Sequence, residues 1–149
     1  MELDEINVKI LNCLRENSRE NASVISEKVG LSVSAVIERI KKLEANELIK
    51  KYTVVLDKNK IGRDVTALMQ VTLDHPKYTE NFISKVKSNN DVLECHYLAG
   101  NYDFLIKICT ISTESLEKIL NKIKAIEGVS KTTTMIVLST VKNEYSVLL

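Results

Sequence analysis

Long hydrophobic runs are missing from this sequence. No apolar stretch approaches the roughly 20 residues of a membrane span, and the N-terminal segment MELDEINVK lacks the pattern of a signal peptide. Cysteine is also scarce: Cys13, Cys95 and Cys109 are an odd number and form no CxxC pair. This usage predicts small buried side chains in a reducing compartment rather than disulfides. Together the absences predict a cytoplasmic protein with no membrane partner.

Catalytic motifs are equally scarce. The only histidines are His75 and His96, and the sequence has no HExxH, no GxSxG, no phosphate-binding GxxxxGK[ST] and no Cys/His cluster at metal spacing. A single histidine in a predicted strand, such as His96, is more often packed or hydrogen-bonded than a metal ligand. We therefore predict that the protein is not an enzyme and has neither a metal site nor a resident cofactor.

An excess of positive charge is absent as well. The chain has 21 Lys and Arg against 20 Asp and Glu, a formal net charge of +1. Any attraction to nucleic acid must therefore come from a local arrangement of charge, multiplied by assembly of several subunits. The sequence is 44% hydrophobic, which predicts packed cores rather than disorder.

The first fifty residues contain three predicted helices. Apolar residues at helical spacing predict them over 4–17, 21–29 and 33–46. Between the last two, Gly30 can adopt a positive φ and Ser32 can cap the following helix. Such a helix-turn-helix holds two helices at a fixed angle and can place the exposed face of the second in a DNA major groove.

The exposed face of the predicted helix over 33–46 carries the candidate DNA contacts. Residues at its start approach base edges, where Glu38 can accept a hydrogen bond from cytosine. Basic side chains at its rim and before the turn would hold phosphates. The DNA-binding candidates are Arg19, Ser32, Ser34, Ala35, Glu38, Arg39 and Lys42. The alternative is a solvated helix face with ordinary pairs four residues apart, such as Glu38 with Lys42.

The rest of the chain has mainly strand patterns. β-branched and aromatic residues predict a strand over 48–57, before a polar stretch that ends at Gly62. Strand and helix patterns then follow in the order βαββαβ of the ferredoxin-like plan, at 65–73, 81–88, 92–99, 104–111, 115–127 and 129–141. We predict an α+β fold with a helix-turn-helix domain, a β-strand linker and a ferredoxin-like domain, at 1–50, 51–62 and 63–149.

The ferredoxin-like plan puts both helices on one face of the sheet, and the other face should be polar if it meets water. The predicted strand over 104–111 is instead largely apolar on both sides, apart from Lys107. An uncovered apolar sheet face needs a partner. We therefore predict dimers that pack sheet to sheet, with two-fold symmetry.

The hairpin loop from Gly100 to Asp103 is a candidate ligand site. Asp103 stands beside backbone N–H donors, a combination that suits a zwitterion, with the acid facing an ammonium and the N–H groups facing a carboxylate. Thr132 and Thr134 share one side of the last strand and could add hydroxyl groups. The alternative is an ordinary hairpin.

A known family has several of these features in the same order. They are Leu3-Asp4, Ile10-Leu11, the turn from Val29 to Ser32, Val36 with Glu38-Arg39-Ile40, Leu43-Glu44, the segment from Ile49 to Thr53, Glu94 to His96, Gly100 to Asp103, and Gly128-Val129 followed by Thr132 and Thr134. On these segments the chain resembles the Lrp/AsnC (leucine-responsive regulatory protein) family of transcription regulators over nearly its full length. It departs from the family at Asn7, often acidic there, and at Val33, often proline.

The resemblance implies a winged-type helix-turn-helix followed by a ferredoxin-like sensor domain. It implies dimers that pack sheet on sheet and often form octamers, with amino-acid effectors bound between dimers near the hairpin loop. The effector-binding candidates are then Leu98, Ala99, Gly100, Asn101, Tyr102, Asp103, Thr132 and Thr134.

These observations predict a sequence-specific, DNA-binding transcription regulator. Its partners would be double-stranded DNA, further copies of itself as a dimer and octamer, and an amino acid that changes its assembly or DNA affinity. One alternative is an architectural protein that wraps DNA with weak specificity. Another is an enzyme like siroheme decarboxylase, which shares this layout but would need histidines and arginines around a tetrapyrrole.

Overall fold

The computed structural model describes residues 3–147, which form two compact units. The division falls between Val55 and Leu56, inside the linker predicted at 51–62. The described segment from Lys142 onward groups with the first unit. Among the described helices, none has the length and apolar character needed to cross a membrane.

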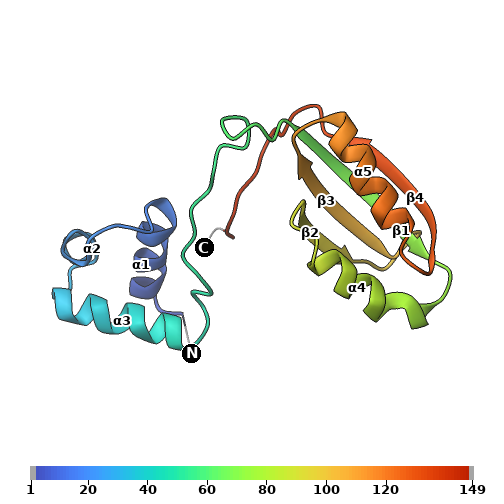
Figure 1. Ribbon diagram of the computed structural model, residues 1–149. Coiled ribbons are helices and arrows are strands. Elements are labelled where there is room, and N and C mark those ends of the chain that lie inside the picture. Colours follow the sequence, from blue (N-terminus) through green and yellow to red (C-terminus); the bar gives the residue numbers. More distant parts are fainter. Residues whose placement is uncertain (1–2, 148–149) are drawn as a thin grey trace. The chain divides into compact units, whose positions relative to one another are not determined.

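The first unit contains α1 (Glu5–Glu16), α2 (Ala22–Val29) and α3 (Val33–Ala45), which confirms the three predicted helices (Figure 1). Helix α1 begins where the Asp4 side chain accepts a hydrogen bond from the Asn7 N–H at 2.7 Å. All three helices contribute to one core, because their apolar side chains recur on one face. Its fully buried members are Ile10, Ile25, Val36 and Leu43.

The turn between α2 and α3 has the predicted chemistry. Gly30 lies at φ 71° and ψ 35°, in the left-handed region, and its N–H donates to the Ser26 carbonyl at 2.9 Å. The Ser32 hydroxyl accepts a hydrogen bond from the Ala35 N–H at 3.2 Å and caps α3. Only Leu31 separates the C-cap Gly30 from the N-cap Ser32, so the backbone of the turn has little conformational freedom.

The strand predicted over 48–57 is absent: no strand lies between Ala45 and Val65. A β-ladder needs a neighbouring strand to take up its backbone hydrogen bonds, and none pairs with this segment in the described part of the chain. The apolar side chains behind the prediction stay exposed, with Val54 80% and Leu56 65% accessible. The described helix-turn-helix therefore has no strand wing.

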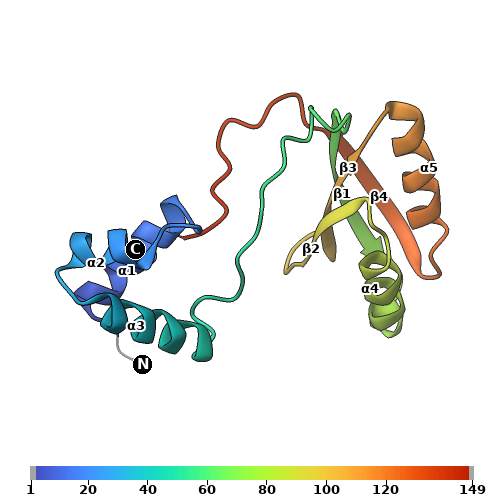
Figure 2. The same cartoon turned by 60° about the vertical axis from the view of Figure 1, so that its left-hand side comes forward.

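The second unit is a four-stranded antiparallel sheet with the order β2-β3-β1-β4. Both helices lie on the same face of this sheet (Figure 2), which confirms the ferredoxin-like plan. Its elements are β1 (Val65–Leu73), the 3-10 turn η1 (Pro76–Tyr78), α4 (Thr79–Lys87), β2 (Val92–Tyr97), β3 (Phe104–Thr110), α5 (Thr113–Lys124) and β4 (Val129–Ile136). The last strand is five residues shorter than the predicted 129–141.

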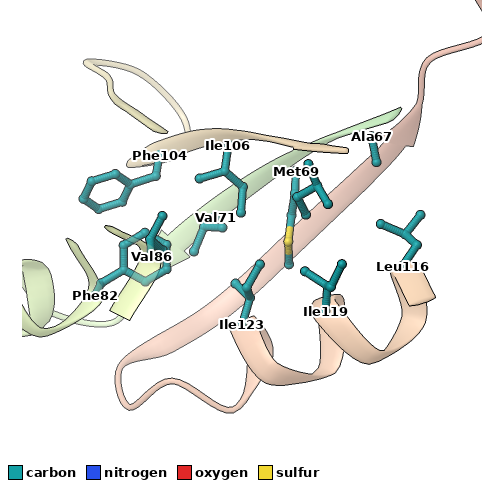
Figure 3. Close-up of a cluster of buried hydrophobic side chains, with 11 residues drawn as sticks. Ala67, Met69, Val71, Phe82, Val86, Phe104, Ile106, Leu116, Ile119 and Ile123 are labelled. Carbon is teal, nitrogen blue, oxygen red and sulfur yellow. The ribbon is translucent and has the colours of Figure 1, made fainter. Parts of the chain in front are cut away.

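The core of the second unit lies between the sheet and the two helices. Figure 3 shows side chains of α5, such as Ile119 and Ile123, pointing toward Met69 and Ile106 on the sheet. The Phe82 and Phe104 rings join α4 to β3, with centroids 4.6 Å apart. The two central strands, β1 and β3, therefore supply most of the sheet residues in this core.

Strand pairing decides which residues share a face, because side chains directly opposite each other lie on the same side. Met69 is opposite Thr134 and Val71 is opposite Thr132, on the helix-covered side. The open face carries apolar residues such as Leu68 and Leu105, but also polar ones. The polar set includes Gln70, Lys107 and Thr133. The prediction of an apolar open face is thus only half right, and that face is mixed.

Candidate functional site

The start of α3 presents the predicted base-contacting residues. Ser32 and Ser34 are exposed, and their hydroxyl oxygens lie 3.1 Å apart. One lone pair of Ser32 is already used by the Ala35 N–H, since this hydroxyl caps the helix. Ser34 and the half-buried Ala35 follow it in the first turn. The cap that begins α3 thus also places small polar groups at its N-terminal end.

Glu38 and Lys42 form an ion pair one turn apart, with Nζ 2.8 Å from Oε1. Both side chains are about two-thirds exposed, at 68% and 64%. The hydrogen bond from Lys42 lowers the pKa of the Glu38 carboxyl below its usual range. The solvated-pair interpretation therefore describes this face in the free protein, and DNA would have to compete with Glu38 for the Lys42 ammonium.

The Arg39 side chain contacts the beginning of α1. Its Nη1 donates to Asp4 Oδ2 at 2.6 Å and to Asn7 Oδ1 at 2.9 Å. The hydrogen bond from Arg39 also lowers the pKa of the Asp4 carboxyl. Asn7 is 6% exposed, so its carbonyl oxygen depends on this donor. Arg39 therefore joins the beginning of α1 to the middle of α3.

A hollow of about 260 Å³ lies along this face. It brings together four of the predicted DNA-binding residues and adds Asn7, which sequence reasoning noted only as a departure from the family. Its lining residues are Asn7, Ala35, Glu38, Arg39 and Lys42. Arg19 lies elsewhere, exposed between α1 and α2, where its N–H donates to the Asn17 side chain at 3.1 Å.

In the second unit, Asp103 fixes the hairpin loop between β2 and β3 to the end of β1. Its Oδ2 accepts a hydrogen bond from the Leu73 N–H at 2.7 Å, and its own N–H donates to the Val71 carbonyl at 3.0 Å. Its carbonyl accepts from the Leu98 N–H at 2.8 Å. The Oδ2 atom of Asp103 thus already accepts a backbone hydrogen bond that fixes the loop to β1.

A small cavity of about 110 Å³ lies beside this loop, at the ends of β1 and β4. It brings together three of the predicted effector residues: Asn101, Tyr102 and Thr132. It adds four residues that the sequence analysis did not single out: Gln70, Thr72, Lys131 and Thr133. The remaining candidates lie outside the lining, namely Leu98, Ala99, Gly100, Asp103 and Thr134.

The two histidines serve local structure. His75 Nδ1 accepts a hydrogen bond from the Lys77 N–H at 3.1 Å and caps η1. His96 Nε2 lies 3.2 Å from Glu94 Oε2, while Lys107 Nζ donates to Glu94 Oε1 at 2.7 Å. The hydrogen bond from Lys107 lowers the pKa of Glu94. This Glu94 cluster lies on the open face of the sheet.

A helix-turn-helix followed by a ferredoxin-like domain with a small polar cavity defines a class of DNA-binding regulators that carry a sensor domain. Family models agree with this class in both halves. The AsnC-type helix-turn-helix domain matches residues 3–44, and the Lrp/AsnC ligand binding domain matches residues 66–147. The chain belongs to the Lrp/AsnC family of transcriptional regulators.

Relatives of known name span almost the whole chain. The HTH-type transcriptional regulator FL11 of Pyrococcus horikoshii is 36% identical over 140 residues, which are 94% of this chain and 92% of the relative. The proline dehydrogenase transcriptional activator of Rhizobium radiobacter is 34% identical, over 95% and 92%. A solved structure of a Neisseria meningitidis transcriptional regulator in complex with L-Met is similar, with a TM-score of 0.93, 27% identity and coverage of 98% and 96%.

Proposed function

We propose that this protein is a transcription regulator whose affinity for DNA changes when an amino acid binds its ferredoxin-like domain. The observation that carries the proposal is the polar cavity beside the hairpin loop, in a chain whose other half is a helix-turn-helix. The L-Met complex of a structural relative supports an amino-acid ligand. The protein acts in the cytoplasm as a non-enzymatic switch, with a reversible effector in place of a resident cofactor.

On DNA, α3 enters the major groove. The small residues at its start and Glu38 read base edges, while Lys42 and Arg19 hold phosphates and set the register. A net charge of +1 gives one subunit little general attraction to DNA. Specific binding therefore depends on paired subunits with their recognition helices at a fixed spacing. An effector that alters this spacing alters the affinity for the operator.

Lys42 gives the sharpest test of this DNA-binding face. We expect Lys42→Gln to weaken binding similarly on operator and random DNA, because a phosphate contact carries no sequence information. The slope of log affinity against log salt should fall by about 1 for each subunit bound. Fluorescence anisotropy over a salt series measures both quantities.

The chain offers a matched control for that variant. Lys118 on α5 is 69% exposed and pairs with Glu114 at 2.7 Å, four residues away, in the same arrangement as Lys42 with Glu38. Lys118→Gln should leave the affinity and its salt slope unchanged. Equal effects of the two substitutions would show that net charge, and not the face of α3, attracts the DNA.

The effector half of the proposal is tested with all twenty amino acids. A mobility-shift assay on the promoter of its own gene should show one or a few of them changing operator affinity by about 5–150-fold, the usual range of coupling between sites. Linkage requires that operator DNA change the affinity for that amino acid by the same factor. If no amino acid changes operator affinity, the effector half of the proposal fails.

Assembly of two or more copies completes the proposed mechanism. The apolar part of the open face around Leu68 and Leu105 and the exposed extended chain around Val54 both provide surface for a second copy. We propose dimers through the sheet domain, gathered into octamers, with the effector near the contact between dimers. Changing that contact alters the spacing between recognition helices.

A further inference from the structure

The cavity beside the hairpin loop is surrounded by residues of polar types, and one of them carries a positive charge. Its seven residues are two amides, three threonines, a tyrosine and Lys131, with no aliphatic and no acidic side chain among them. We propose that its ligand is an amino acid with an acidic side chain, aspartate or glutamate. This inference rests on the proposed function, since it names the class of effector for the same site.

The charge of the cavity favours an acidic side chain on the ligand. No carboxylate in the described part of the chain lies within ion-pair distance of the Lys131 ammonium. The acid of the hairpin loop, Asp103, is outside the cavity and accepts from the Leu73 N–H. A second carboxylate on the ligand can therefore pair with Lys131, and charge-assisted hydrogen bonds are about twice as strong as neutral ones.

The residues that line the cavity favour a polar side chain on the ligand. A leucine or methionine side chain gains affinity by burying apolar surface against apolar surface. Here it would face Thr72, Thr133 and the amide of Gln70, and it would displace water from groups that it cannot hydrogen-bond. A polar side chain replaces those lost hydrogen bonds, so the hydroxyl and amide groups of the lining favour a polar ligand over an apolar one.

The volume of the cavity and its hydrogen-bonding groups also suit the ammonium and α-carboxylate of a free amino acid. At about 110 Å³ the cavity is well below the roughly 300–1,000 Å³ of sites for drug-sized molecules, so it suits a compact metabolite. The side-chain carbonyls of Gln70 and Asn101 can accept from the ligand's ammonium. Their amide N–H groups and the Tyr102 hydroxyl can donate to its α-carboxylate.

Calorimetric titration of the full-length chain tests the inference with six ligands: L-aspartate, L-glutamate, L-asparagine, L-glutamine, L-methionine and L-leucine. We expect an acidic amino acid to bind at least tenfold more tightly than its own amide and than either apolar ligand. Lys131→Gln should remove the preference for acid over amide, whereas Lys131→Arg should keep most of it. Lys131 is exposed, and thermal unfolding will check that each variant is folded.

Lys122→Gln is the matched control, because Lys122 is an exposed lysine on α5, across the sheet from the cavity. It should leave all six affinities unchanged. Tighter binding of methionine or leucine, or equal binding of an acid and its amide, overturns the inference while leaving an amino-acid effector in place. Binding of none of the six ligands also overturns the inference, whereas only the lack of any effect by all twenty amino acids in the mobility-shift assay overturns the effector proposal itself.

Discussion

Replacement of Gly128 by alanine is expected to destabilise the ferredoxin-like unit by about 2–5 kcal/mol. Gly128 lies at φ 89°, a conformation that residues with a Cβ adopt poorly, and an added Cβ would overlap the Tyr78 side chain. Tyr78 cannot easily move, since it is the last residue of η1 and the N-cap of α4, with the Lys77 ammonium 4.8 Å from its ring centre. Urea unfolding followed by circular dichroism measures the loss.

Gly100→Ala is the matched control for this prediction. Gly100 is also a loop glycine beside a strand, but its φ is not in the left-handed region and a Cβ there would meet no neighbour within 4 Å. Its stability should stay within about 0.5 kcal/mol of the wild type. Equal stability of the two variants would mean that the Tyr78–Gly128 packing does not constrain the fold.

The Gly128 variant should also weaken ligand binding. Gly128 accepts a hydrogen bond from the Asp74 N–H at 2.8 Å and directly precedes β4, which carries Lys131 into the cavity. A shift in the start of β4 displaces that ammonium relative to Gln70 on β1. Stability and effector affinity should therefore fall together in Gly128→Ala.

Sequence reasoning predicted the helices and the order of the strands well because both depend on local signals. Gly30 and Ser32 mark a turn that their own backbone chemistry requires, and the alternating apolar residues of β1 need only a helix layer to cover them. The prediction of a strand over 48–57 was wrong for a non-local reason. Residues with high β-propensity form a strand only when another strand pairs with them, and the described chain supplies none.

The candidate ligand site shows the same division between local and non-local information. The turn residues Asn101 and Tyr102 were found from the hairpin signal alone, and both line the cavity. Gln70 was missed because its place depends on β1 lying between β3 and β4. Thr132 and Thr134 were preferred to Thr133, but pairing with the buried Val71 and Met69 puts both on the helix side, and only Thr132 of the two borders the cavity. A shift of one residue changes the face of a strand.

Arg39 was predicted to hold a phosphate, and its contacts lead to a different expectation. Arg39→Gln should destabilise the three-helix unit by about 1–3 kcal/mol, because the buried Asn7 carbonyl oxygen loses its donor. Operator affinity should fall through a misplaced α3, with the salt slope unchanged. A phosphate contact instead predicts a slope lower by about 1 and an unchanged stability.

The substitution Asp4→Asn distinguishes a structural role of Arg39 from a phosphate contact while Arg39 itself stays unchanged. Because Arg39 lowers the pKa of Asp4 in the folded protein, their pairing stabilises the fold above the usual carboxyl pKa of about 4 and is lost as the pH falls through the lowered value. Both variants should therefore be less sensitive to acid than the wild type. Asp4→Asn should also weaken operator binding if Arg39 positions α3. It should strengthen binding if the freed guanidinium reaches a phosphate, and that result would restore the phosphate role of Arg39.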